Sequence, residues 1–144
     1  MRDLRGCVGR VDGVVGVAVL LAASAGVQAD DIVVGEKPAG WVERALFTSA
    51  VVDREPVDAV VMVESGPAVV SFFTELRQLS GRTVTHRWEY AGEVVAEVPF
   101  EVGGPRWRVH SQKQLWPEQA GRWSVIVVDE SGWILHAEML EYRP

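Results

Sequence analysis

Three arginines are the side chains of this sequence that are best suited to binding a charged ligand. Arg87, Arg106 and Arg108 lie in stretches where polar and apolar residues alternate. A guanidinium group donates two parallel hydrogen bonds to a carboxylate and also stacks on aromatic rings, here Tyr90 or a tryptophan. Trp116, in a polar loop, can hold a glycan or a protein partner. We therefore predict a binding surface of five residues: Arg87, Tyr90, Arg106, Arg108 and Trp116.

The same residues also have structural interpretations, which the sequence leaves open. The arginines can pair with Glu89, Glu97 and Glu101 in a salt-bridged outer face of a sheet. Trp116 can instead close one end of the fold as a packed loop aromatic.

A serine and a lysine two residues apart have the spacing of a Ser–Lys hydrolase dyad. Ser111 and Lys113 share one face of a strand-like segment. Such a dyad also requires an oxyanion hole and a lysine whose pKa is lowered by shielding from water. No glycine-rich turn surrounds Ser111. We therefore expect a strand-end serine beside a solvated lysine, and we predict no catalytic residue.

The three histidines do not have the spacing of a metal site. His86, His110 and His136 lie in separate strand-like segments, and no two of these histidines are two or four positions apart. His86 lies between Val84 and Trp88 on a face that we predict to be buried. A buried imidazole must be hydrogen-bonded to the backbone or to a hydroxyl. We therefore expect His86 to be structural, and we expect no metal or other cofactor.

The stretch 83–102 predicts a β-hairpin. A two-residue turn, Ala91-Gly92, would mix apolar and charged residues on both faces. A three-residue loop, Tyr90-Ala91-Gly92, pairs Trp88 with Val94 and makes one face almost wholly apolar. We therefore predict the three-residue loop, with its glycine in the left-handed conformation.

A second hairpin is predicted from Arg122 to Tyr142, with the three-residue loop Glu130-Ser131-Gly132. In that register Trp123 faces Met139. Both faces of this hairpin are apolar, which predicts a central place in a sheet or a covering partner.

About eight strand-like segments with short glycine- and proline-rich turns predict an all-β fold. The spacing indicates an antiparallel β-sandwich of immunoglobulin-like size with seven to eight strands. One strand is expected at 68–76, followed by a helical turn or a loop at 75–81. Six residues are expected to be structural, in the core or in the two hairpin loops: His86, Trp88, Gly92, Trp107, Trp123 and Gly132.

The first 29 residues have the pattern of a secretory signal peptide. Three arginines precede an apolar run at 14–25, and Val27-Gln28-Ala29 is a small-x-small cleavage site. The run is shorter than the ~20 residues that span a bilayer. We predict a signal peptide at 1–29, a flexible lead at 30–44 and a β-sandwich domain at 45–144. An uncleaved anchor is the alternative.

Charge and cysteine content narrow the possible partners. The leader holds three arginines and two aspartates, so its removal would change the net charge from −6 to −7. Acidic residues scattered along the chain argue against nucleic acid and against an anionic lipid surface as partners. The single cysteine, Cys7, lies in the leader, so the exported domain would contain no disulfide.

Several motifs, most of them centred on tryptophan, occur in a fixed order between residues 45 and 142. They are Arg54-Glu55-Pro56-Val57-Asp58, Phe72-Phe73-Thr74-Glu75-Leu76, His86-Arg87-Trp88-x-Tyr90-x-Gly92, Arg106-Trp107-Arg108-x-x-Ser111-x-Lys113, Gly121-x-Trp123-x-Val125 and Asp129-x-x-Gly132. In these motifs the chain resembles a bacterial family called domain of unknown function 2914 (DUF2914). The resemblance implies an exported or membrane-tethered domain without an assigned activity, and it carries no catalytic residues.

Together these patterns predict a non-enzymatic domain, periplasmic or secreted, that binds an envelope protein or a cell-wall glycan. The first alternative is a structural or assembly module of a larger envelope complex, in which another chain covers the last hairpin. A Ser–Lys hydrolase is a further alternative. The oligomeric state is not predicted by the sequence.

Overall fold

The structure, a computed structural model, describes residues 36–144, and the regular secondary structure in this range is almost entirely β-strand. Its seven long strands are β1 (Trp41–Thr48), β5 (Ala68–Arg77), β6 (Thr83–Tyr90), β7 (Glu93–Glu101), β8 (Arg106–Leu115), β9 (Gly121–Asp129) and β10 (Ile134–Tyr142). Three strands have two residues each: β2 (Val51–Val52), β3 (Glu55–Pro56) and β4 (Met62–Val63). A short 3-10 helix, η1 (Pro117–Gln119), follows β8. The predicted signal peptide lies outside the described residues.

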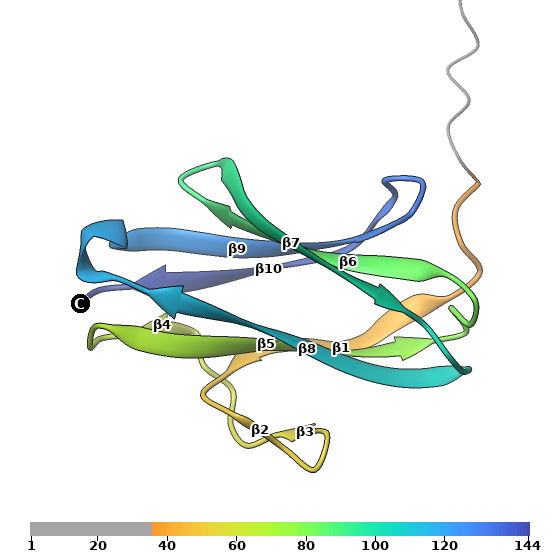
Figure 1. Cartoon of the computed structure of the whole chain (residues 1–144), viewed down its shortest axis with the longest axis horizontal. Coiled ribbons are helices and arrows are strands. Elements are labelled where there is room, and N and C mark those ends of the chain that lie inside the picture. Colours follow the sequence, from red (N-terminus) through yellow and green to blue (C-terminus); the bar gives the residue numbers. More distant parts are fainter. Residues whose placement is uncertain (1–35) are drawn as a thin grey trace, which may run out of the picture. The chain divides into compact units, whose positions relative to one another are not determined.

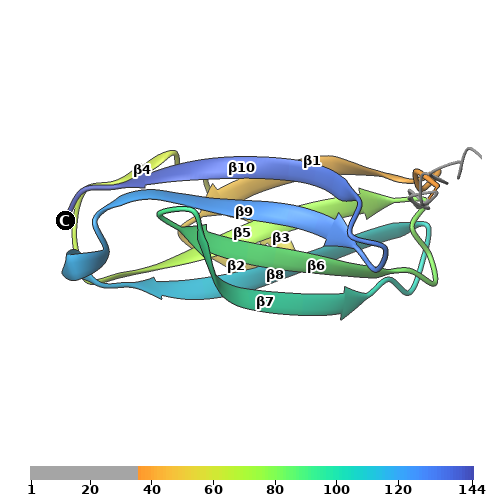
Figure 2. The ribbon, with the colours of Figure 1, turned by 90° about the horizontal axis from the view of Figure 1, so that it is seen from above.

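The long strands form two sheets that pack face to face (Figures 1 and 2). One sheet has the order β1-β5-β8, and the other has the order β4-β10-β9-β6-β7. All neighbours are antiparallel except β4 and β10. β5 pairs with β8 although the β6–β7 hairpin, in the other sheet, lies between them in the chain. This connection is typical of immunoglobulin-like sandwiches, and the predicted all-β sandwich is confirmed.

Alternating side chains of both sheets build the core. The inward residues of the central strands are almost fully buried: Val70, Phe72, Leu76, Val84, Trp88, Trp123, Val125 and Val127. Complete burial of one such side chain typically contributes about 1.5–3 kcal/mol. β5 is also buried on its outer face, where Phe73 and Glu75 are each 1% exposed. The β2–β3 ribbon lies on that outer side of the sheet (Figure 1).

The first predicted hairpin is present as β6–β7, but its predicted loop is wrong. Tyr90 pairs with Glu93 across the two-residue turn Ala91-Gly92, whose φ angles are 50° and 83°. Such a turn matches the twist of the strands. A bulge in β7 then restores the alternation, so Trp88 pairs with Ala96, two residues further along β7 than predicted. The predicted apolar face is therefore kept.

The second hairpin, β9–β10, has the predicted loop but not the predicted register. Asp129 N–H donates to the Trp133 carbonyl at 3.0 Å, which closes the three-residue loop. A bulge after Ile134 shifts β10 by one residue, so Trp123 pairs with Leu140 rather than with Met139. The shift turns Met139 to the outer face, where it is 61% exposed. Ile134, which precedes the bulge, lies on the same face and is 60% exposed. This bulge has no signature in the local sequence pattern.

Two strands extend beyond their predicted limits. β1 begins at Trp41, inside the segment predicted to be a flexible lead. β5 continues to Arg77, so Glu75 lies in a strand and not in a turn or loop. The extra length of β5 matters because it places Glu75 and Arg77 beside charged residues of the neighbouring strands.

We expect replacement of Asp129 by Ala to lower the free energy of unfolding by about 2–3 kcal/mol. The Asp129 carboxylate is buried and accepts hydrogen bonds from the Ser131 and Trp133 amides, at 3.0 and 2.8 Å, and from Arg82 Nη2 at 3.0 Å. Urea denaturation measures the loss. Asp129→Asn keeps an acceptor oxygen and should lose less. Equal losses in the two variants would contradict the loop-closing role.

Candidate functional site

A glutamate on the central strand of the three-stranded sheet gathers arginines from all three strands. Glu75 on β5 pairs with Arg44 on β1 and with Arg108 on β8. Arg77, two residues further along β5, pairs with Arg106 on β8. Because side chains alternate along a strand, the residues at these paired positions all project from the outer face of the sheet.

Glu75 is a buried carboxylate held by three guanidinium groups. Its side chain is 2% exposed. It accepts hydrogen bonds from Arg106 Nε at 2.8 Å and from Arg44 Nε and Nη2 at 3.0 and 2.8 Å, and Arg77 Nη2 lies 2.7 Å away. The hydrogen bond from Arg106, supported by Arg44, lowers the pKa of Glu75 to about 2 although burial opposes the shift. Glu75 therefore stays charged and holds these arginines in place.

Glu55 ties the β2–β3 ribbon to the same group of charges. Its carboxylate accepts a hydrogen bond from Arg44 Nη2 at 2.9 Å and another from Arg108 Nη1. The hydrogen bond from Arg44 is the main reason why the pKa of Glu55 is lowered. The ribbon is thus anchored over the outer face of the sheet by two arginines from different strands.

Arg54 reaches this region from the tip of the ribbon. Asp53 and Arg54 have φ angles of 50° and 63°, the left-handed conformation, which costs on the order of 1 kcal/mol for residues other than glycine. Within residues 36–144, Arg54 has no ion-pair partner. Its side chain is therefore not needed to hold the ribbon, and its charge can meet a ligand.

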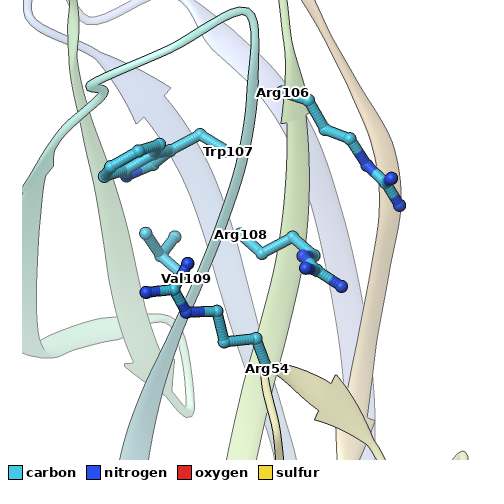
Figure 3. Close-up of a pocket in the computed structure, with 5 residues that line it drawn as sticks. All are labelled: Arg54, Arg106, Trp107, Arg108 and Val109. Carbon is cyan, nitrogen blue, oxygen red and sulfur yellow. The ribbon is translucent and has the colours of Figure 1, made fainter.

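A hollow of about 280 Å³ lies beside these charges, lined by Arg54, Arg106, Trp107, Arg108 and Val109 (Figure 3). Trp107 is 36% exposed, and its ring packs so closely on Gly103 that a Cβ there would lie 2.8 Å from it. The prediction that Trp107 belongs to the core is therefore wrong, because β8 is the outermost strand of its sheet and leaves the ring partly open.

Positive charge exceeds negative charge in this arginine cluster, which we define as Arg44, Arg54, Glu55, Glu75, Arg77, Arg106 and Arg108. The excess occurs on a chain whose net charge is −6. Guanidinium groups favour carboxylates and phosphates, and a local positive field concentrates such anions. Trp107 and Val109 add an apolar wall. The hollow can therefore bind an anionic group that is attached to a flat or aliphatic one.

Only two of the five predicted binding residues, Arg106 and Arg108, come together. Arg87 lies on the other sheet and is paired with Glu97 at 2.9 Å. Tyr90 packs on Trp123, with ring centroids 4.9 Å apart, and donates a hydrogen bond to the Ala120 carbonyl at 3.0 Å. Trp116, which is 49% exposed, follows the far end of β8. It lies roughly 30 Å along the strand from Trp107.

Sequence analysis missed most of the arginine cluster: Arg44, Arg54, Glu55, Glu75 and Arg77. Two of the motifs that carry the family resemblance contain Arg54, Glu55 and Glu75, and these motifs were the available signal. No sequence signal pointed to Arg44 and Arg77. These two arginines reach the cluster only through the pairing of β1, β5 and β8, which the sequence does not specify.

The buried polar group of the core is built around His86. Its Nδ1 lies 2.9 Å from Ser111 Oγ, and its Nε2 lies 2.9 Å from Thr74 Oγ1. Trp88 Nε1 also donates to Ser111 Oγ, at 3.0 Å. Burial, with a smaller effect of the charge of His110, lowers the pKa of His86 to about 3. The imidazole is therefore neutral and satisfied by two hydroxyls, which fits its expected structural role.

The remaining predicted structural residues lie in the core or in turns. Trp88 and Trp123 are 0% exposed. Gly92 and Gly132 have φ angles of 83° and 84° in the two hairpin loops. These conformations are readily adopted by glycine and cost other residues energy.

The other residues with catalytic or ligating chemistry do not converge. No hydrogen bond among the described residues joins Ser111 to Lys113, since Ser111 Oγ bonds His86 and Trp88. His136 pairs with Glu138 at 3.0 Å. No group of three metal-ligating side chains is found within residues 36–144. No helix in this part of the chain is long and apolar enough to cross a membrane.

Comparison with known families agrees with the motifs. The model of a family described as protein of unknown function (DUF2914) matches residues 81–139. The chain resembles DUF2914. The match covers β6 to β9 and most of β10, a shorter range than the motifs suggested. It includes the β8 side of the hollow but not Arg54. No curated protein matches the chain.

We expect Glu75→Gln to lower the free energy of unfolding at pH 7 by about 3 kcal/mol, because a neutral amide leaves three arginines without their counter-charge. The folded-state pKa of Glu75 is about 2, below its usual 4.5. Its contribution is therefore complete above pH 4.5 and decreases as the pH falls towards 2. Urea denaturation at pH 7 and at pH 3 should show the difference between wild type and variant falling by more than half. A difference that does not depend on pH would contradict this account.

We expect His86→Ala to lower the free energy of unfolding at pH 7.5 by about 3 kcal/mol, through the cavity and the two hydroxyls left without a partner. The folded-state pKa of His86 is about 3 and its usual value is 6.5, so the unfolded chain takes up a proton first as the pH falls. The wild type should lose about 2 kcal/mol between pH 7.5 and pH 5 through this residue. The variant should lack this component. Identical pH dependence of both proteins would exclude a neutral buried imidazole.

Proposed function

We propose that this chain is a non-enzymatic, exported binding module of the bacterial envelope that holds an anionic envelope component in the hollow beside β8. The observation that carries the proposal is the arginine cluster on an otherwise acidic chain: four guanidinium groups pair with two carboxylates, and a fifth, that of Arg54, lines the hollow beside them. Acidic envelope proteins and the peptide-bearing glycan of the wall both present carboxylates, and both are candidate ligands.

The geometry supports binding because the cluster is preformed. Glu75 and Glu55 hold Arg44, Arg106 and Arg108 before any ligand arrives. Side chains that are ordered in the free protein lose less conformational freedom on binding, which favours affinity. Arg54 adds a charge with no ion-pair partner within residues 36–144, and Trp107 adds a partly exposed ring.

Arg54→Ala is the sharpest test, because Arg54 lines the hollow and no salt bridge within the described residues depends on it. Full-length protein is mixed with purified cell-wall sacculi and, separately, with solubilised envelope proteins, and the retained fraction is measured at low and high salt. We expect Arg54→Ala to weaken retention about tenfold, as the loss of one charge-assisted hydrogen bond would. High salt should weaken it as well.

Two matched variants serve as controls. Arg122→Ala removes an exposed arginine from β9 in the other sheet, and Trp116→Ala removes an exposed tryptophan far from the hollow. Both should retain the ligand as the wild type does, whereas Trp107→Ala should not. Retention that is insensitive to Arg54 and Trp107, or equally sensitive to Arg122, would contradict the proposal.

An assembly module is the second candidate function, and one observation favours it. Ile134 and Met139 expose apolar surface on the outer face of the β9–β10 hairpin. If another chain covers this face, Met139→Lys should abolish capture of envelope protein and Arg54→Ala should leave it unchanged.

A further inference from the structure

The hollow lies against an unpaired strand edge. Arg106 and Arg108 project from one face of β8, and Trp107 and Val109 project from the other, because side chains alternate along a strand. Four consecutive residues of alternating direction can line one hollow only where it meets the side of the strand (Figure 3). β8 pairs with β5 on one side only. The main-chain N–H and C=O groups on its other side have no strand partner.

β8 is also the least protected of the four edges of the two large sheets in residues 36–144. β4 has only two residues, β1 contains a bulge, and β7 contains a bulge and Pro99. Short strands, bulges and prolines are the usual means of preventing a further strand from pairing with an edge. β8, in contrast, pairs with β5 through ten consecutive residue pairs without a register shift. Its backbone is therefore regular enough to accept another strand.

The charges on this edge select the kind of strand that can pair with it. Arg106 and Arg108, together with Arg54 from the β2–β3 ribbon, would repel a second basic strand and attract carboxylates. Trp107 and Val109 face the opposite side and favour apolar side chains. A strand paired with β8 has the same two-residue alternation, so its acidic and apolar residues must alternate.

We propose that the anionic ligand of this site is an extended segment of a partner protein, with alternating acidic and apolar residues, which adds to the free edge of β8 as a further strand. The inference rests on the proposed binding function and names its ligand class and its binding mode. Main-chain hydrogen bonds to β8 supply affinity, and the arginines and Trp107 supply specificity.

The test uses a fluorescent eight-residue peptide of alternating glutamate and valine, and anisotropy measures its binding to the full-length protein. We expect binding that weakens about tenfold for Arg54→Ala and is unchanged for Arg122→Ala. A peptide with four glutamates followed by four valines has the same charge and composition but no alternation, and it should bind at least tenfold more weakly.

Backbone methylation separates strand addition from simple charge attraction. In a paired strand, alternate amides face the neighbouring strand and the others face away. Only one set of peptide amides, those of the glutamates or those of the valines, can face β8. N-methylation of that set should therefore abolish binding, and N-methylation of the other set should be tolerated. Equal effects of both methylations would overturn strand addition, as would failure of the unmodified peptide to bind.

A second probe, an acidic glycan, distinguishes failure of this inference from failure of the proposed function. Trigalacturonate presents carboxylates on sugar rings but has no amides. If it binds in an Arg54-dependent way and the alternating peptide does not, the hollow is an anion site for glycans and strand addition is wrong. If neither probe binds and retention on sacculi and envelope proteins is insensitive to Arg54, the proposed function fails as well.

Discussion

The buried carboxylate of Glu75 is the interaction on which the outer face of the three-stranded sheet depends. Three arginines from β1, β5 and β8 surround it, and one of them, Arg44, also pairs with Glu55, which in turn binds Arg108. Without this negative charge, the guanidinium groups would repel one another. With it, they form a preformed cluster that anchors the β2–β3 ribbon and leaves a surplus of positive charge beside the edge of β8. Structure and proposed binding therefore rest on the same ion pairs.

The two faces of β5 show how one strand serves two purposes. Its inner face packs Phe72 and Leu76 into the core and brings Thr74 to His86, while its outer face carries Glu75. Both faces are buried. The inner face is apolar except for Thr74, which hydrogen-bonds the neutral imidazole of His86, and the outer face is ionic. Buried polar groups of either kind are tolerated only when they are satisfied, and we expect each to favour the observed position of β5 between its neighbours.

Alternation of residue types was enough to predict the strands, the all-β sandwich and the inward direction of Val84, His86 and Trp88, because period-two patterns report directly on which face is buried. The exact pairing was not predictable. Both hairpins contain a bulge that depends on packing elsewhere, and one bulge leaves Met139 exposed where Leu140 was expected. The arginine cluster was predicted only through Arg106 and Arg108, since Arg44 and Glu75 meet through β1–β5 pairing across 31 positions of the chain. Trp107 was misplaced because its pattern is that of a core strand, whereas β8 lies at an edge.

The central claim is that the surplus charge held by Glu75 makes the edge of β8 the place where an envelope ligand binds. The most direct measurement is an NMR titration of ¹⁵N-labelled protein with soluble acidic fragments of the envelope, both wall fragments and peptides. The account predicts that the largest shift changes occur at Arg54 and from Arg106 to Val109, including the arginine side-chain signals. Changes centred on Ile134 and Met139, or on Trp116, with none at the hollow, would contradict it.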